Sequence, residues 1–185
     1  MLLPSQNPTA SGLKIGDTLD NGFILTAIDR NQNYTWAGTD KGLFRFSNKN
    51  NKKHFYPLHT NGFVSDYVTS VCCRANGQVW IGTLNGMLEY DGYGFIVYCT
   101  ENSKLPENHV TAISEDKNED LWIGTEKSGV VKIHHNHFYT YNHFNSTLPF
   151  DIIKTIGPDA KGKFVINASE KDSVSLASIQ KNFKK

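Results

Sequence analysis

The sequence lacks the features that mark several large classes of protein. Its 185 residues include three cysteines, Cys72, Cys73 and Cys99, and an odd number without regular spacing predicts neither a disulfide framework nor a zinc site. A pairing of Cys99 with Cys72 or Cys73 stays open. No apolar run is long enough to cross a bilayer, so no membrane insertion is expected. The N-terminal residues have neither the basic nor the apolar region of a signal peptide.

The chain also lacks an excess of charge of either sign. Its 19 basic and 18 acidic residues give a formal net charge of +1, and no basic run before the C-terminus is longer than Lys52-Lys53. No nucleic-acid partner is therefore expected. Aromatic residues make up 12% of the chain, too many for a disordered polypeptide, and the length suffices for a sizeable core.

What the chain does contain is a repeat. Three anchors share the pattern Trp-x-Gly-Thr, and a fourth is degenerate: Trp36-Ala37-Gly38-Thr39, Trp80-Ile81-Gly82-Thr83, Trp122-Ile123-Gly124-Thr125 and Phe164-Val165-Ile166-Asn167. Their first residues lie 44, 42 and 42 positions apart. A period in the low forties with a strand-like centre is typical of a β-propeller blade.

Each copy divides into four short strands. In the third copy, alternating apolar and small polar residues predict strands at 110–113, 121–125, 130–133 and 137–141. Asn-Gly and Asp-Gly pairs separate the strands of the second copy, as in β-hairpins. A helical period of 3.6 is absent outside the last dozen residues. The predicted fold is therefore all-β, a propeller of about four four-stranded blades.

The predicted boundaries follow from this repeat. Residues 1–11 form an N-terminal tail and residues 12–185 the propeller, with blades at 25–67, 68–109, 110–152 and 153–185. The last blade has no room for an outer strand, so residues 12–15 are expected to supply it and close the ring, which would remove an exposed sheet edge. A closed ring from one chain and association of two chains, such as a homodimer, both stay open.

The repeat resembles the two-component regulator propeller repeat. The resemblance lies in Val-Thr-x-Ile, a polar turn, Leu-Trp-Ile-Gly-Thr, a glycine turn, a short apolar strand and Phe-x-x-Tyr, best seen at 110–141 and 68–98. The first copy has Ala37 in place of isoleucine, and in the fourth Phe164 replaces tryptophan and Asn167 replaces threonine. The resemblance implies the periplasmic sensor part of a bacterial hybrid two-component regulator, which commonly holds two seven-bladed propellers that detect glycans. This chain has about four blades and no kinase or receiver segment, so the resemblance implies the sensing part at most.

Several groups of chemically active residues are interpreted as structural. The histidines His134, His135 and His137, with His143 nearby, fall on a hairpin tip and a linker, and adjacent turn residues point apart, so no metal site is predicted. Trp36, Trp80 and Trp122 are expected to pack between blades rather than to form a sugar-stacking platform. The carboxylates Asp116, Glu119 and Asp120 lie in one turn and form neither an acid–base pair nor a calcium loop.

The edge that carries the turns between second and third strands and the linkers between blades offers the best candidate site. Short polar and charged groups around a central depression suit hydrogen bonds to a hydroxyl-rich ligand. The predicted ligand-binding residues are Asp40, Lys41, Asn85, Glu126, Lys127, Asn102, Asn108 and Asn145.

These observations predict a non-catalytic propeller that binds a ligand, by resemblance a glycan or another small molecule in the periplasm, and no cofactor. A protein-interaction scaffold is the alternative. A propeller lyase or hydrolase is the third reading, and it is disfavoured because the innermost strands offer hydroxyl groups without a base beside them, namely Thr26, Thr69, Ser70, Thr111 and Thr155.

Overall fold

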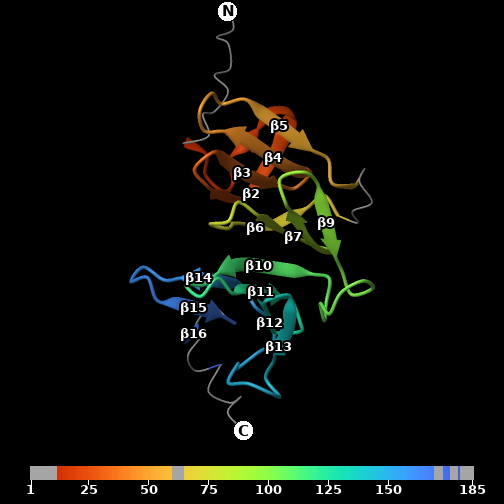
Figure 1. The fold of residues 1–185 in the computed structure, drawn as a ribbon, viewed down its shortest axis with the longest axis vertical. Coiled ribbons are helices and arrows are strands. Elements are labelled where there is room, and N and C mark those ends of the chain that lie inside the picture. Colours follow the sequence, from red (N-terminus) through yellow and green to blue (C-terminus); the bar gives the residue numbers. More distant parts are fainter. Residues whose placement is uncertain (1–11, 60–64, 169–172, 176–178, 180–185) are drawn as a thin grey trace, which may run out of the picture.

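The computed structural model describes residues 12–59, 65–168, 173–175 and 179. These residues form sixteen β-strands in four antiparallel sheets, together with a short 3-10 turn at Asp20–Gly22. The predicted all-β class is confirmed. The first and second sheets lie in one half of the molecule, and the third and fourth sheets lie side by side in the other half (Figure 1).

The strands of each sheet are consecutive in sequence. The first sheet holds β1 (Thr18–Leu19), β2 (Phe23–Arg30), β3 (Tyr34–Thr39), β4 (Gly42–Ser47) and β5 (Lys53–Tyr56). The second holds β6 (Val68–Cys73), β7 (Val79–Thr83), β8 (Gly86–Tyr90) and β9 (Phe95–Tyr98). The third holds β10 (Val110–Glu115), β11 (Leu121–Thr125), β12 (Val130–His134) and β13 (His137–Tyr141). The fourth holds β14 (Thr155–Pro158), β15 (Phe164–Asn167) and β16 (Ser173–Ser175).

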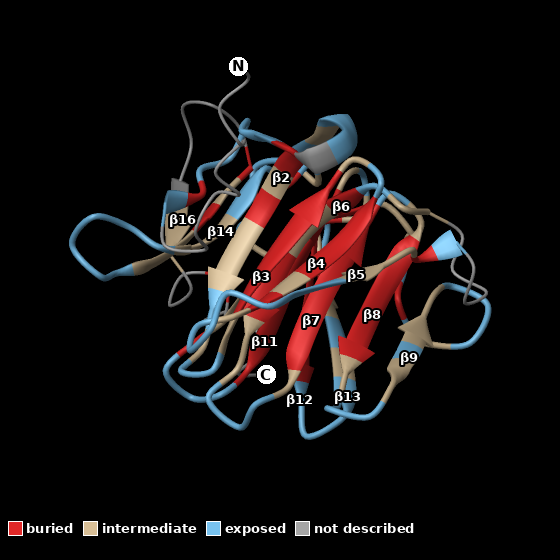
Figure 2. Cartoon of the chain, turned by 90° about the horizontal axis from the view of Figure 1, so that it is seen from above, coloured by how far each residue is buried: buried red, intermediate tan, exposed pale blue. Residues whose placement is uncertain are grey.

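The sheets meet along their innermost strands, which are β2, β6, β10 and β14, as propeller blades do around an axis. Strand β6 packs on β2 and on β10, and β10 packs in turn on β14. Among the described strands, β14 and β2 are not neighbours, so the four sheets form an open arc. The buried residues concentrate in the middle strands, where β7 and β11 are buried along their whole length (Figure 2).

The tryptophans fill the junctions between sheets, as predicted. Trp36, Trp80 and Trp122 are 1%, 5% and 0% exposed. Each belongs to a cluster that draws apolar residues from its own sheet and from the next; the Trp36 cluster, for example, contains Val68 and Ile81 of the second sheet. A buried indole is not available to stack on a sugar.

The glycine of each anchor is where the next sheet approaches most closely. A methyl group on Gly38 would lie 2.3 Å from Val68 Cγ1, and one on Gly82 would lie 2.7 Å from Val110 Cγ1. A methyl group on Gly124 would lie 2.6 Å from Cγ2 of Ile153, which precedes the first strand of the fourth sheet. The repeated glycine is therefore a packing requirement, because its missing side chain makes the space for a branched residue of the next sheet.

The fourth anchor is shifted by one residue from the sequence alignment. Ser114 pairs with Trp122 in the third sheet, and the corresponding Gly157 pairs with Val165 in the fourth. Val165, not Phe164, therefore occupies the tryptophan position. Phe164 instead lies 6.5 Å from Trp122, centroid to centroid, and packs back against the third sheet.

Residues 12–15 do not form the predicted closing strand. Leu13 packs on the first sheet in a cluster with Leu25 and Ala37, and the following turn is fixed by a 2.8 Å hydrogen bond from Gly16 N to Leu25 O. The physical reason is that the first sheet has an outward apolar face with no preceding sheet to cover it, and the N-terminal segment covers that face.

The three cysteines are free thiols. Burial raises the pKa of Cys72 to about 12 and raises the pKa of Cys73 as well. Neither thiol is therefore ionised at neutral pH. The described residues include no helix long and apolar enough to span a membrane.

Candidate ligand-binding rim

In each blade, one turn joins the strand of the Trp-x-Gly-Thr anchor to the strand that follows it. These turns lie on one edge of the arc, beside the chain segments that lead into the innermost strands. We call this edge the linker rim. The same backbone hydrogen bond recurs along it: Asp40 N donates to Ile24 O at 3.1 Å, Leu84 N to Tyr67 O at 3.4 Å and Glu126 N to His109 O at 3.2 Å. The structure thus places Asp40, Leu84 and Glu126 at equivalent positions on one edge, and Asn85 follows Leu84 in the same turn, where it corresponds to Lys41 of the first sheet.

Four residues of this rim did not emerge from the sequence. They each precede the first buried residue of an innermost strand, and they are Ile24, Tyr67, His109 and Ile152. Ile24, Tyr67 and Ile152 are 48%, 40% and 52% exposed. The four copies have different kinds of side chain at this position, so the alignment shows no pattern there. The sequence also does not distinguish an exposed apolar residue beside a strand from a buried residue of that strand.

Asp40 and Lys41 form the first-sheet part of the rim. Asp40 Oδ1 accepts a 2.8 Å hydrogen bond from Ile24 N, so the carboxylate helps to hold the rim together. Lys41 Nζ donates to Gly22 O at 3.2 Å and lies 3.8 Å from Asp40 Oδ2. Both side chains reach solvent, and this exposed ion pair contributes little to stability.

Glu126 carries the negative charge of the third-sheet part. Its Oε2 lies 3.0 Å from His109 Nδ1 and 3.5 Å from Lys127 Nζ. The hydrogen bond with His109 is the main cause that lowers the pKa of Glu126. Lys127 is tied through its backbone N–H, which donates to Glu107 Oε2 at 2.7 Å. The rim therefore holds an ionised carboxylate with a histidine and a lysine beside it.

The asparagines of the rim divide into two kinds. Asn102 and Asn145 use both ends of their amides on the backbone, since their Oδ1 atoms accept from Cys99 N and Asn142 N and their Nδ2 atoms donate to Val97 O and Thr140 O. Asn108 Oδ1 accepts from Thr100 N at 2.8 Å. The described residues give the Asn85 side chain no hydrogen bond, which leaves its amide the most available of the set.

The histidine run lies on a hairpin tip. Strand β12 ends at His134 and β13 begins at His137, and the two residues between them have positive φ, 46° at His135 and 62° at Asn136. His143 pairs instead with Asp151 in the linker to the fourth sheet. Within the described ranges, no group of three His, Cys, Asp or Glu side chains could hold a metal ion.

The predicted turn carboxylates are structural. Asp116 is buried and accepts hydrogen bonds from Asn118 N, Asp120 N and Trp122 Nε1, at 2.8, 3.1 and 3.0 Å. Asp120 is also buried; it pairs with Lys132 at 2.6 Å and with His134. Burial opposes ionisation of Asp120, but the hydrogen bonds from Lys132 and His134 outweigh it and lower its pKa.

Replacing Asp120 by asparagine is expected to lower the free energy of unfolding at pH 7 by about 1–2 kcal/mol, because a charge-assisted hydrogen bond to a nearly buried lysine is weakened. A carboxyl whose pKa is lowered by folding stabilises the protein above its unfolded pKa of about 3.9, and that contribution disappears as the pH falls through the folded pKa. The difference from the wild type should therefore become smaller as the pH falls. Urea unfolding at pH 7 and pH 3 measures it, with Glu119→Gln in the same turn as control; an equal difference at both pH values would contradict the assignment.

A family model for the two component regulator propeller matches residues 62–85 and 104–127. Each match contains an innermost strand, a Trp-x-Gly-Thr anchor and the first residues of the following rim turn. The chain carries two-component regulator propeller repeats.

A relative of these repeats is Histidine kinase P4 of Formosa agariphila, which is 36% identical over 78 residues that make up 38% of this chain and 6% of that protein. The extracellular domain of a putative hybrid two component system from B. thetaiotaomicron superposes with a TM-score of 0.65 at 23% identity, over 78% of this chain and 20% of that chain. The catalytically inactive H270A virginiamycin B lyase from Staphylococcus aureus gives a TM-score of 0.66 at 16% identity, over 87% of this chain and 56% of that chain. These structural likenesses show the propeller fold. The chain spans only a small part of the relatives that carry two-component repeats.

Proposed function

We propose that this chain is the ligand-sensing propeller of a bacterial two-component regulator, that it works in the periplasm, and that it binds a glycan at the linker rim. The repeats support this proposal, as do a relative named as a histidine kinase and a structural neighbour named as an extracellular domain. Sensor propellers of this kind are generally non-catalytic.

The observation that supports the proposal is that corresponding turns of three successive sheets lie on one edge. Asp40, Asn85 and Glu126 belong to these turns, although Leu84 rather than Asn85 holds the position of Asp40 and Glu126. We propose that one ligand lying across the arc contacts all three turns. Carboxylate oxygens accept hydrogen bonds from sugar hydroxyls, and an amide both donates and accepts. The Tyr67 ring adds an amphipathic surface of the kind that packs against the C–H face of a sugar.

The innermost strands support a binding role over a catalytic one. Thr26 Oγ1 donates to Val68 O, and Thr69 Oγ1 donates to Val110 O, both at 2.6 Å. These hydroxyls tie each sheet to the next one. A nucleophile needs a neighbouring base instead, and none contacts these hydroxyls among the described residues.

A protein partner is the second candidate function, and the apolar side chains of the linker rim favour it. Ile24 and Ile152 are exposed at equivalent positions, Leu84 lies beside Tyr67, and the linker to the fourth sheet exposes Phe144 and Phe150. Exposed apolar side chains that gather on one face are typical of protein interaction sites.

The triple variant Asp40→Asn, Asn85→Ala and Glu126→Gln tests the glycan site. Asparagine at position 40 keeps an acceptor for Ile24 N, so the rim should stay folded. On an array of immobilised oligosaccharides, any class that the wild type binds should be bound at least about 100-fold more weakly by the variant, because two charge-assisted hydrogen bonds are lost. Circular dichroism against temperature checks folding, and Glu119→Gln, on the opposite edge, is the matched control.

Tyr67→Ala separates the two candidate functions. A glycan that stacks on the ring should lose affinity in this variant, whereas Ile24→Ser with Ile152→Ser should leave it unchanged. Retained glycan binding by the triple variant would exclude the linker rim as the site. If no oligosaccharide binds the wild type, the glycan proposal fails and the protein partner becomes the leading function.

A further inference from the structure

Each sheet has one face that meets the next sheet in chain order, and we call it the forward face. In the first three sheets this face carries the anchor tryptophan, which is buried in the junction. It also carries the anchor glycine, where an added Cβ would lie 2.3, 2.7 and 2.6 Å from a branched residue of the following segment. A forward face therefore receives its neighbour through two features, a large ring that fills the junction and a position without a side chain.

The fourth sheet has neither feature. Cross-strand pairing places Asn167 opposite Thr155, just as the anchor glycine of the third sheet lies opposite Ala112. Asn167 therefore holds the glycine position, and Val165 holds the tryptophan position. A smaller apolar residue replaces the ring, and a polar side chain replaces the missing one.

These two residues lie on the forward face of the fourth sheet. Successive side chains of a strand point to opposite faces of its sheet. Ile166, which lies between them, is completely buried in a cluster with Trp122, and Phe164 packs on the same side. Val165 and Asn167 are only partly buried and belong to the other face.

The Asn167 side chain is fixed where an incoming sheet would insert. Its Nδ2 donates to Thr155 Oγ1 of the innermost strand at 2.6 Å. At the equivalent position of the first sheet a single added carbon would already lie 2.3 Å from Val68 Cγ1. The amide is larger than that carbon, so a further sheet cannot pack on the fourth in the way that the second packs on the first.

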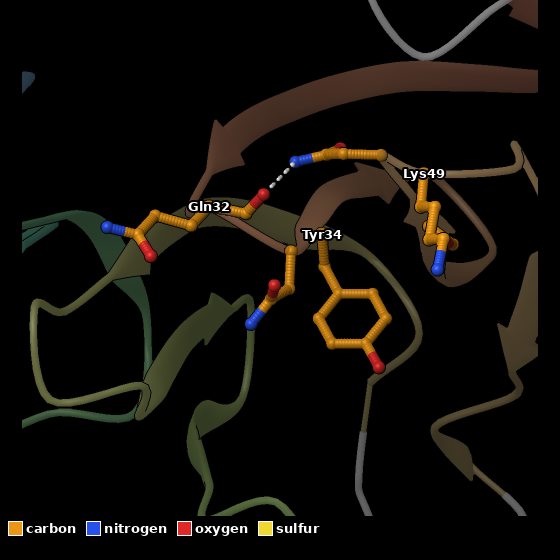
Figure 3. A pocket seen from close by; sticks show the side chains of 6 residues that line it. Gln32, Tyr34 and Lys49 are labelled. Carbon is orange, nitrogen blue, oxygen red and sulfur yellow. Dashed lines mark hydrogen bonds between the residues drawn. The ribbon is translucent and has the colours of Figure 1, made fainter.

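A hollow of about 280 Å³ lies over this face, and Thr155, Val165 and Asn167 are among the residues that line it. Another hollow, of about 360 Å³, lies between two turns of the first sheet (Figure 3). There Asn48 Nδ2 donates to Gln32 O at 3.3 Å and connects the turns. Of these two hollows, the one on the fourth sheet therefore lies on a sheet face, in the place that a neighbouring sheet fills at the other junctions.

The first sheet ends the arc in a different way. Leu25 pairs with Thr39 as Val68 pairs with Thr83, so Leu25 holds the position of the residue that a later sheet inserts into its neighbour. Leu25 is 1% exposed and is buried in a cluster with Leu13 of the N-terminal segment. The residue that this sheet would insert into another forward face is thus already covered.

We propose that the arc is capped at both ends against a second copy of this chain, by Asn167 at the fourth sheet and by the segment around Leu13 at the first. Two arcs that joined into one ring would each have to insert a first sheet into the fourth sheet of the other. Terminal units with a polar outer face limit the growth of stacked arrays in this way. This inference concerns assembly and does not depend on the ligand proposed for the linker rim.

Two full-length variants that open one end each test the proposal. The acceptor variant, Val165→Trp with Asn167→Gly, restores the ring and the empty position of a forward face. The donor variant, Leu13→Asp, places a charge in the apolar cluster and so releases the cover of Leu25. In sedimentation velocity at rising concentration, an equimolar mixture of the two should form a heterodimer. The wild type alone, and the wild type mixed with either variant, should stay monomeric.

The matched control is Val165→Trp with Asn167→Ala, which differs from the acceptor variant by one methyl group. It should bind the donor variant about tenfold more weakly or worse, because the extra Cβ overpacks the junction. Circular dichroism checks the fold of each variant, and Leu13→Ser is the milder donor variant if Leu13→Asp does not fold.

Three results would overturn the proposal. The first is a concentration-dependent dimer of the wild type that Asn167→Arg abolishes, since the fourth sheet would then be an interface. The second is a folded donor variant that does not associate with the acceptor variant. The third is equal binding by the variants with glycine and alanine at position 167.

Discussion

Trp122→Ala is expected to lower the free energy of unfolding by about 3–5 kcal/mol, the usual cost of truncating a buried tryptophan. Trp122 has no exposed surface, packs on Tyr141 at 5.7 Å between ring centroids, and lies in the cluster that joins the third and fourth sheets. Its removal leaves a cavity at that junction. It also removes the Nε1 donor to Asp116, a buried carboxylate. Urea unfolding followed by circular dichroism measures the loss.

Replacing tryptophan by phenylalanine separates the contribution of ring packing to stability from that of the indole N–H group. Trp122 Nε1 has a partner, whereas Trp36 Nε1 and Trp80 Nε1 are buried without one. Trp122→Phe should therefore cost about 1–3 kcal/mol more than Trp36→Phe, because only the former leaves a buried acceptor short of a hydrogen bond. Equal costs would show that the Asp116 contact contributes nothing, and a neutral Trp122→Ala would refute the packing role.

Gly38→Ala is expected to destabilise the chain by about 1–3 kcal/mol, the typical cost of adding a methyl group to a filled site. The new Cβ would lie 2.3 Å from Val68 Cγ1, 2.8 Å from Val68 Cβ and 3.3 Å from Ala27 Cβ. Val68 is completely buried and cannot move away without disturbing the second sheet. The first and second sheets must therefore separate slightly, and the junction that contains Trp36 loses contacts.

The partner substitution makes this prediction specific. Val68→Ala removes Cγ1, the atom that the new Cβ would approach most closely, although Cβ of residue 68 remains. The double variant Gly38→Ala with Val68→Ala should therefore be more stable than the sum of the two single effects indicates. A coupling free energy of about 1 kcal/mol or more is expected for residues in direct contact. Gly77→Ala measures conformational strain without a clash, because Gly77 has a φ of 91° and open space around it. Additive effects at positions 38 and 68 would contradict the proposed close contact.

The repeat predicts most of this fold because its signals are local. Each Trp-x-Gly-Thr anchor became a second strand; Asn76-Gly77 lies between β6 and β7, and Asn85 precedes β8, which begins at Gly86. The fourth copy was harder, because neither Phe164 nor Val165 is a tryptophan and only the cross-strand pairing with Gly157 decides between them. The role of residues 12–15 depends on which apolar face lacks a cover, and that is a property of the assembled sheets.

The candidate sites could be predicted only in part. The polar rim turns follow from turn chemistry and from the constant order of strands, so Asp40, Asn85 and Glu126 could be placed on one edge from the sequence; their role in binding stays a prediction. The exposure of Ile24 and Ile152 depends on the path of the chain around the arc, which composition does not specify.

The threonine hydroxyl hydrogen bonds that join neighbouring innermost strands are not present at every junction. Thr26 and Thr69 each reach the backbone of the following sheet, but the hydroxyl of Thr111, at the third junction, is buried without a hydrogen-bond partner. The third junction is therefore held by the backbone hydrogen bond from Ile153 N to Thr125 O at 3.0 Å and by the apolar cluster around Trp122, without a side-chain hydroxyl bond. Because each sheet of the arc packs mainly on its immediate neighbours, the C-terminal sheet depends for its attachment on that apolar cluster more than the other sheets do.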